Sequence, residues 1–175
     1  MAPILVTGAT PGPSRPTVTR VDVRPVTVEE AVTLAFEPEA FGERFGLALV
    51  AGWDEPGTLE PTVEALEGGV DPRWLTHLLV DAGEVVGMGG FTGPPCDGEV
   101  EVGYHVAPDR RGRGLATAAV RTWVDRARTA GLTRVLARTA PGPNASTTVL
   151  TRCGFVRDRG REEEAATWWW VRPLP

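Results

Sequence analysis

One segment in the second half of the chain constrains both fold and function. In residues 106–116, an apolar run ends, a glycine-rich turn follows, and a long helical pattern begins at once. Because Gly112 and Gly114 have no side chains, backbone N–H groups of the turn can approach an anion closely, and the helix start adds partial positive charge. An ordinary surface turn would also use glycines, but Arg111 and Arg113 add donors for charge-assisted hydrogen bonds. The segment therefore predicts a phosphate-binding site.

The hydrophobic pattern around this segment predicts a mixture of strands and helices. Thr27 and Glu30 form a capping box, Pro61 is expected at the first position of a short helix, and Gly131 at the end of a long one. Strands are expected at 21–23, 74–80, 85–91, 99–106, 135–139, 155–158 and 167–172, and helices from 28, at 39–50, 61–66, 115–130 and 146–153. The three strands between 74 and 106 follow one another through turns, which indicates an antiparallel meander.

The length of 175 residues, 42% of them apolar, suits a single domain. Residues 1–18 contain four prolines and are expected to form an irregular arm, with the domain covering 19–175. Residues 4–10 resemble the first strand and turn of a dinucleotide-binding unit. However, Pro11 and Pro13 stand where a helix would have to begin and hold a pyrophosphate, so this function is nearly excluded.

Composition excludes several other classes of protein. A net charge of −5 and a pI near 5.1 argue against nucleic-acid or membrane-surface binding by bulk attraction. All 18 basic residues are arginine, so no lysine can form a Schiff base or complete a phosphate loop. The two cysteines and two histidines are not spaced as metal ligands, and no disulfide framework is possible. With no signal-peptide pattern, a cytoplasmic location is expected.

The pattern Arg111-x-x-Gly114-x-Ala116 resembles the acyl-CoA pyrophosphate signature of the GNAT superfamily of N-acetyltransferases, and the resemblance extends over residues 19–173. It is closest to the ribosomal-protein-alanine acetyltransferases, in residues 87–91 and in 101–108. The resemblance implies an α/β (α+β) fold with a mixed, mostly antiparallel sheet of about six to seven strands flanked by helices. It also implies acetyl-CoA as co-substrate and no metal.

The resemblance also implies which residues hold the cofactor. The strand end would pair with the pantetheine arm, and the turn would hold the pyrophosphate. The residues implied are Val106, Arg111, Gly112, Arg113, Gly114, Leu115, Ala116, Thr117 and Asn144. The chain departs from the family pattern at one of them, since Pro143 stands where the family has asparagine and Asn144 follows one step late. Asn144 can contact the cofactor or cap the helix that follows.

Acetyl transfer requires a base for the attacking amine, a donor for the developing oxyanion and a proton for the leaving thiolate. Backbone N–H groups near Val106 are the expected oxyanion donors. Glu101 is the leading candidate base, acting directly or through water. His105 lies on the same face of the strand by two-residue parity and is the second candidate, because imidazole exchanges protons near neutral pH. A bulge in the strand would overturn this parity.

The proton donor is less clear from the sequence. Many family members have a tyrosine on the helix that follows the position of Ser146. This chain has Leu150 there, and its only tyrosine is Tyr104. Ser146 is the candidate donor, directly or through water. A thiolate is a fair leaving group, so a missing acid affects the rate less than a missing base.

The resemblance implies an acceptor with a primary amine, on a small molecule or a peptide N-terminus. An α-amine is a weaker base than a lysine amine, so a modest catalytic base suffices for it. Acidic residues before residue 110 could attract a cationic acceptor, although such charges usually form a solvated face. The run Trp168-Trp169-Trp170 is expected to pack in the fold, with a substrate wall or a homodimer contact as the alternatives. A non-catalytic acyl-CoA sensor is the competing function.

Overall fold

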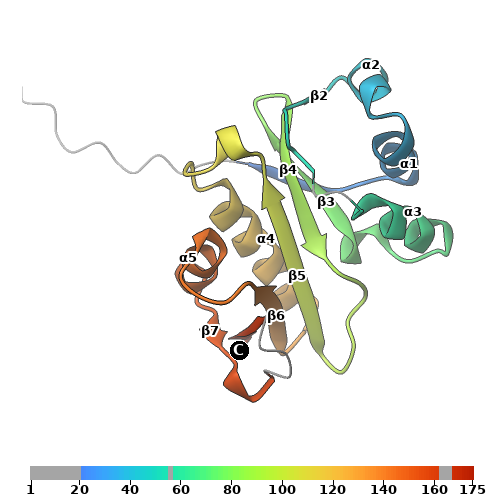
Figure 1. Cartoon of the computed structure of the whole chain (residues 1–175). Helices are drawn as coiled ribbons and strands as arrows, with labels where there is room; N and C mark the ends of the chain where they lie inside the picture. The colour runs from blue at the N-terminus through green and yellow to red at the C-terminus, as the bar shows by residue number, and fades with distance from the viewer. Residues whose placement is uncertain (1–20, 55–56, 162–166) are drawn as a thin grey trace, which may run out of the picture.

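The fold is built on an open β-sheet. The computed structural model describes residues 21–54, 57–161 and 167–175. Within them the sheet has eight strands in the order β1-β3-β4-β5-β6-β8-β7, with β2 paired to β4 outside this path (Figure 1). The β5–β6 and β2–β4 pairs are parallel and the other pairs are antiparallel. The expected mixed, mostly antiparallel sheet is confirmed, with eight strands in place of six to seven.

The strands are β1 (Asp22–Pro25), β2 (Ala48–Leu49), β3 (Thr76–Asp81), β4 (Glu84–Phe91), β5 (Glu99–Val106), β6 (Arg134–Thr139), β7 (Val156–Arg157) and β8 (Trp168–Pro173). The helices are α1 (Val28–Phe36), α2 (Phe41–Phe45), α3 (Leu59–Glu67), α4 (Leu115–Thr129) and α5 (Ala145–Arg152). Short 3₁₀ turns lie at Pro38–Ala40, Pro72–Trp74, Pro108–Arg110 and Arg159–Arg161. The predicted N-terminal arm and the segment that resembles a dinucleotide-binding unit lie outside the described residues.

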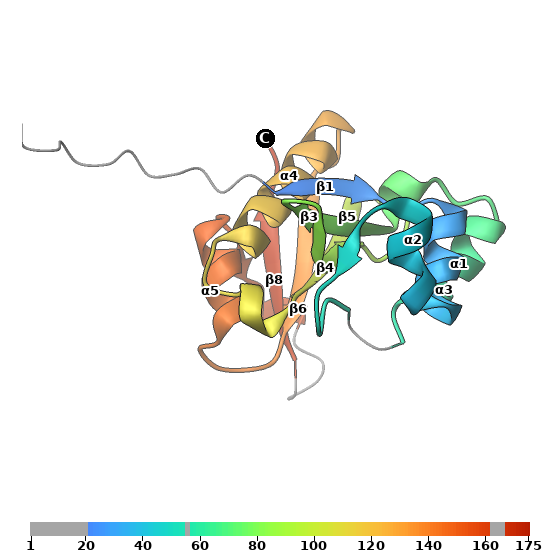
Figure 2. The same cartoon turned by 90° about the horizontal axis from the view of Figure 1, so that it is seen from above.

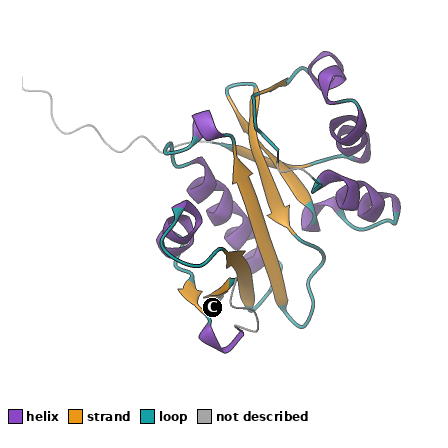
Figure 3. Cartoon of the chain, viewed as in Figure 1, coloured by secondary structure: helices purple, strands orange, loops and turns teal. Residues whose placement is uncertain are grey.

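Helices cover both faces of the sheet. Seen from above, α1, α2 and α3 gather on one side, and α4 and α5 lie on the other (Figure 2). Figure 3 shows the same separation, with the helices in two groups on either side of the strands. Each side has its own apolar core. One cluster joins α1–α3 to β3 and β4, and the other joins α4 and α5 to the centre of the sheet.

The capping box predicted at the start of α1 is confirmed. The Thr27 hydroxyl accepts a hydrogen bond from the Glu30 backbone at 3.2 Å, and the Glu30 carboxylate accepts from the Thr27 backbone at 3.0 Å. The same carboxylate accepts from both terminal nitrogens of Arg24, at 2.6 and 3.0 Å. Burial alone would raise the pKa of Glu30, but its hydrogen bonds from Arg24 and Thr27 lower it overall. This buried ion pair ties the first helix to the edge strand.

Two expectations for the N-terminal half were wrong in detail. The helical stretch predicted at 39–50 ends at Phe45, because Gly46 takes a left-handed conformation with φ 69°. The residues after it form the short strand β2, which was not predicted. The short helix α3 begins at Leu59, so Pro61 is its third residue and not its first. A proline is tolerated throughout the first helical turn, because backbone N–H groups there have no partner within the helix.

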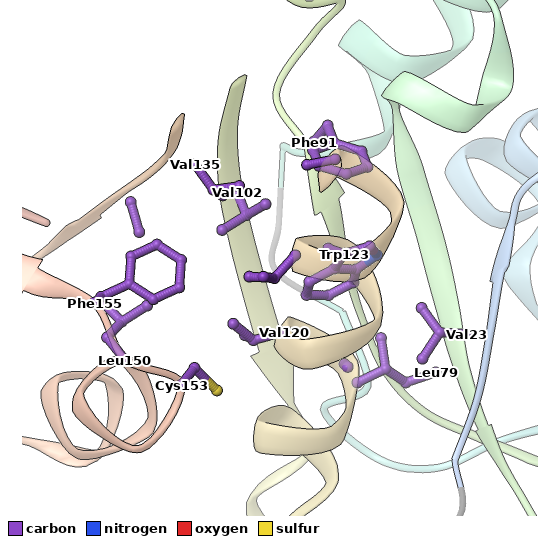
Figure 4. Packing of buried hydrophobic residues seen from close by; sticks show 14 of the residues in the cluster. Val23, Leu79, Phe91, Val102, Val120, Trp123, Val135, Leu150, Cys153 and Phe155 are labelled. Carbon is purple, nitrogen blue, oxygen red and sulfur yellow. The ribbon is translucent and has the colours of Figure 1, made fainter. Parts of the chain in front are cut away.

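The long helix α4 packs its apolar face on the centre of the sheet. Trp123 and Val120 are fully buried there, among residues from β1, β3, β4, β5 and β6 (Figure 4). The close approach depends on Gly89 of β4. A Cβ atom at Gly89 would lie 2.7 Å from the Trp123 ring and 2.6 Å from the carbonyl oxygen of Gly103. The glycines of residues 87–91 are therefore explained in part by packing.

The three consecutive tryptophans divide between the faces of β8, as expected for neighbours in a strand. Trp170 belongs to the core beside α4, where its indole donates to the Thr139 hydroxyl at 3.0 Å. Trp168 packs against the same core. Trp169 lies on the other face, and the guanidinium of Arg138 stacks over its ring at 5.2 Å from the centroid. Packing thus accounts for two of the three rings, and the third lies against Arg138.

The buried His77 makes stability sensitive to acid. Burial, and secondarily the charge of Arg126, lower its pKa to about 4. Its Nδ1 donates to the Leu75 carbonyl at 2.9 Å, and its Nε2 has no hydrogen-bond partner among the described residues. The folded protein therefore holds His77 neutral at a pH where the unfolded chain, with a pKa of about 6.5, takes up a proton.

We expect the unfolding free energy to fall by about 3 kcal/mol as the pH drops from about 6.5 to about 4 because of His77. Chemical denaturation at several pH values measures this slope. The His77→Asn variant keeps a donor for Leu75 but cannot titrate, so its stability should depend less on pH in this window. The same slope in both proteins would contradict the assignment.

Candidate active site

The two central strands separate and leave an opening in the sheet. The ladder between β5 and β6 ends at Val102 and Ala137, although β5 continues to Val106 and β6 to Thr139. Figure 1 shows these two strands diverging toward the start of α4. Beyond the last pair, no strand of the described residues lies along the edge of β5 that faced β6.

The backbone groups that face this opening can be identified from the ladder on the other edge of β5. Thr92 donates to the Glu101 carbonyl at 3.0 Å, and Ala107 donates to the Val86 carbonyl at 2.9 Å. Odd-numbered residues of β5 therefore bond to β4, so the backbone groups of Tyr104 and Val106 point toward the opening. The register shows no shift along β5, so the parity on which the site prediction rested holds. These main-chain groups can pair with an extended ligand.

A cavity of about 590 Å³ lies at the opening, between the end of β5 and the first turns of α4 and α5. It brings together most of the residues predicted to hold the cofactor. Those that line it are Val106, Arg111, Gly112, Gly114, Leu115, Ala116, Thr117 and Asn144. Its lining also includes Arg152 of α5, which the sequence analysis did not select. Arg152 follows Thr148, another lining residue, by one helical turn, and this spacing was the available signal.

The turn before α4 has the geometry of an anion site. Gly112 and Gly114 take left-handed conformations with φ 76° and 80°, and Gly114 is the N-cap of the helix. No side chain caps α4, so the N–H groups of its first turn point toward the cavity without a side-chain acceptor. The residues present therefore fit a diphosphate group, which would lie against these N–H groups.

The arginines of this turn contact protein atoms. Nε of Arg111 donates to the Val106 carbonyl at 2.9 Å, and Arg110 forms an ion pair with Glu84 at 2.8 Å. Arg113 forms an ion pair with Asp81 at 3.0 Å and does not line the cavity. The side chains thus fasten the turn to β5 and to the β3–β4 hairpin. The backbone N–H groups of the first turn of α4 have no side-chain partner among the described residues, so they are the groups best placed to receive an anion.

Asn144 caps α5, which was one of its two predicted roles. Its Oδ1 accepts from the Thr147 backbone at 3.0 Å, and its Nδ2 donates to the carbonyls of Ala140 and Gly142, each at 3.1 Å. Because Asn144 also lines the cavity, cofactor contact remains a prediction.

Tyr104 links β5 to the start of α5. Its hydroxyl donates to the Ser146 carbonyl at 3.2 Å, and both residues line the cofactor cavity. Burial raises the pKa of Tyr104 well above its ordinary value, so the hydroxyl stays protonated across the neutral range. Two hydroxyl groups, those of Ser146 and Tyr104, therefore lie at this end of the cavity. The sequence left the role of Tyr104 open, since nothing in it predicted contact with α5.

A second cavity, of about 660 Å³, lies on the face of the sheet covered by α3. Its wall is largely apolar, with Pro61 and Ala65 from α3, Leu75 before β3, and Met88 from β4. Tyr104 and His105 line both cavities. The two cavities therefore share a wall at the end of β5.

The candidate bases lie on the face of β5 that borders the second cavity. Glu101 accepts from Nε of Arg138 at 2.7 Å, and Arg138 lines the cavity. Glu101 itself lines neither cavity, and its link to the second one is this hydrogen bond from Arg138. His105 lines both cavities, and its Nε2 is 3.0 Å from the Gly52 carbonyl. Arg138 was not predicted as a site residue, because its contact with Glu101 joins two strands that are far apart in the sequence.

The described part of the chain offers neither a metal centre nor a membrane-spanning helix. No group of three or more His, Cys, Asp or Glu residues there could hold a metal ion. None of the described helices is long and apolar enough to cross a membrane.

Comparison with known proteins identifies the family. The family model described as an acetyltransferase (GNAT) domain matches residues 20–156. The chain therefore belongs to the GNAT acetyltransferase family, as its signature suggested, and is an acyltransferase with acetyl-CoA as its co-substrate. No curated protein sequence matches it.

Solved structures share the fold at low sequence identity. The ribosomal-protein-S5-alanine acetyltransferase of Vibrio fischeri is 19% identical with a TM-score of 0.62, covering 89% of this chain and 94% of that one. Mycobacterium smegmatis RimJ, in complex with CoA-disulfide, is 22% identical with a TM-score of 0.60, covering 87% and 81%. A phosphinothricin acetyltransferase from Sinorhizobium meliloti, in complex with AcCoA, is 18% identical with a TM-score of 0.59, covering 88% of each chain.

Proposed function

We propose that the protein transfers an acetyl group from acetyl-CoA to a primary amine, on a small molecule or a peptide N-terminus, by direct attack in a ternary complex. The observation that carries the proposal is the wall that two cavities share at Tyr104 and His105. One cavity has the anion-binding turn that a coenzyme A diphosphate requires, and the other has room for a separate acceptor. This arrangement suits direct transfer, because both substrates can be bound at once.

Bound acetyl-CoA supplies a thioester, whose carbonyl carbon forms the new C–N bond as the C–S bond breaks and the acceptor nitrogen loses a proton. The protein chain positions the pantetheine arm and the thioester carbonyl for this reaction. Backbone groups of Tyr104 and Val106 align the pantetheine arm, and the N–H of Val106 is the proposed donor to the carbonyl oxygen, where negative charge develops. A rigid strand edge suits this task, since its donors need no rearrangement during the reaction.

Glu101 is the proposed base for the acceptor amine, acting directly or through water. Arg138 holds its Oε1, whereas no hydrogen bond occupies Oε2 among the described residues. His105 remains the second candidate. Its Nε2 lies 3.0 Å from the Gly52 carbonyl oxygen, to which it can donate. The hydroxyl of Ser146, at the end of the cofactor cavity, is the proposed proton source for the leaving thiolate.

A non-catalytic acyl-CoA sensor is the alternative function, favoured by Leu150 at the position where many family members have tyrosine. Leu150 is fully buried in the core, and its aliphatic side chain has no proton to donate. Thiol release separates the two functions. We expect free coenzyme A to accumulate when acetyl-CoA is mixed with a panel of amines, and mass spectrometry to find the acetylated amine. Binding of acetyl-CoA without thiol release for any amine would support the sensor.

We also propose a cytoplasmic location and a homodimeric assembly. A reducing cytoplasm suits the two free cysteines, exposed Cys96 and buried Cys153. A homodimer is the proposed assembly, and sedimentation measures it directly.

A further inference from the structure

Gly103 lies on β5 between the two candidate bases, with Glu101 two residues before it and His105 two residues after it. All three share the face of the strand that borders the second cavity, and Gly103 lines that cavity. Any side chain at this position would therefore extend into the space where the proposed acceptor is held.

Packing does not explain the glycine at this position. At Gly87 and Gly89 of the neighbouring strand, an added Cβ atom would lie only 2.3 and 2.6 Å from carbonyl oxygens of β5. At Gly103 an added Cβ atom meets nothing within 4 Å, and the backbone is not in the left-handed region. Neither a close approach nor a special conformation requires a glycine there, so its effect is to leave the cavity open.

The other walls indicate what this space accepts. Met88, Leu75, Val70, Ala65 and Pro61 present apolar surface. Its threonine hydroxyls are partly satisfied within the protein, since Thr62 and Thr76 share a hydrogen bond of 2.7 Å. Such a wall favours an apolar group over a polar one.

Charge at the cavity disfavours acceptors with several amines. Among the described residues that line it, Arg138 is the only arginine and no aspartate or glutamate is present. A second ammonium group would find no carboxylate in the lining, and the nearby carboxylate of Glu101 is already bonded to Arg138 at 2.7 Å. The cationic acceptor suggested by the acidic N-terminal half of the sequence is therefore not supported here.

We propose, building on the acetyl-transfer function above, that Gly103 determines acceptor specificity by leaving room for one compact apolar group beside the reacting amine. The acceptor class is a monoamine whose amine-bearing carbon carries an aliphatic side chain, as at a leucine N-terminus. Gly103 acts as a specificity residue and takes no part in the chemistry.

Three acceptors test this assignment: glycinamide, leucinamide and spermidine. For the native protein we expect kcat/KM for leucinamide to exceed that for glycinamide by about tenfold or more, because an aliphatic side chain is removed from water. Spermidine should react more slowly than leucinamide. Gly103→Leu should lower kcat/KM for leucinamide about tenfold or more and leave that for glycinamide within about threefold. Gly103→Ala should give an intermediate loss.

Ala48→Leu is the matched control, since Ala48 is an exposed strand residue that lines neither cavity. It should alter no acceptor ratio. Equal losses for glycinamide and leucinamide in Gly103→Leu, or no loss for either, would overturn the assignment.

Calorimetry separates this assignment from the proposed function, because it needs no turnover. Leucinamide should bind the native protein saturated with coenzyme A, and bind Gly103→Leu at least about tenfold more weakly. If this difference holds while no amine is acetylated, the proposed transfer is wrong and the cavity assignment stands. If leucinamide binds both proteins equally, or neither, the assignment is wrong.

Discussion

The Thr117→Asp variant should bind coenzyme A about 100-fold more weakly than the native protein. Thr117 lies in the first turn of α4 and lines the cofactor cavity. Side chains of a helix lean toward its N-terminus, so the new carboxylate would approach the proposed diphosphate. Two unit charges about 5 Å apart at an effective dielectric constant of about 20 repel by about 3 kcal/mol, which corresponds to about 100-fold in affinity. Isothermal calorimetry at low salt measures the loss.

Thr117→Asn is the matched control, because it has the same shape as the aspartate variant without the charge. Its affinity should stay within a few-fold of the native value. The aspartate variant should remain folded, since the first turn of α4 has no acidic residue and a negative charge there is favourable by about 0.3–1 kcal/mol. Added salt should restore part of its affinity. Equal affinities for the two variants would place the diphosphate away from this helix.

Removal of the proposed base should lower kcat by a factor at least as large as the loss of coenzyme A affinity expected for Thr117→Asp. Glu101→Gln should lower kcat about 100-fold or more, the usual contribution of a positioned general base. Affinity for coenzyme A should be unchanged, because Glu101 does not line the cofactor cavity. The glutamine oxygen can still accept from Arg138, so the local geometry is kept. Steady-state kinetics with a reactive amine, combined with calorimetry, test both parts.

His105→Gln is the comparison that decides between the two candidate bases. If Glu101 is the base, this variant should lose less than about tenfold in kcat, well below the contribution of a general base. The reverse order of effects would assign the role to His105. Unaltered rates of Glu101→Gln across neutral and alkaline pH would remove Glu101 from the mechanism. Tyr104 does not complicate this range, because burial raises its pKa and keeps it protonated.

The elements with strong local signals could be predicted from the sequence. The capping box of α1 and the glycine-rich turn before α4 depend on neighbours within a few residues, and both were recovered. The left-handed glycine that ends α2 was missed, because Phe41, Phe45 and Leu49 kept helical spacing beyond it. A period of 3.6 continues by chance over a few positions, whereas the backbone conformation of Gly46 decides where the helix stops.

The candidate site could be predicted only where it is local in sequence. Most of the proposed cofactor residues lie in one turn, which is why a short pattern found them. The proposed acceptor cavity is assembled from α3, β4, β5 and β6, and its side chains come together only through strand pairing and helix packing. Arg138 contacts Glu101 across a parallel pair of strands, and no spacing within one segment encodes such a contact. The hydrogen bond from Tyr104 to Ser146 spans 42 positions, so no local pattern predicts it either.

The opening between β5 and β6 implies that the two halves of the site can evolve at different rates. Main-chain atoms at the edge of β5 and at the start of α4 are present whatever side chains mutate around them, so gradual substitution leaves the hold on a common donor molecule intact. The shape of the proposed acceptor side depends on which side chains are present or missing, so one or two replacements there change it. During evolution, one fold can therefore acquire specificity for different amines while it continues to use the same acetyl donor.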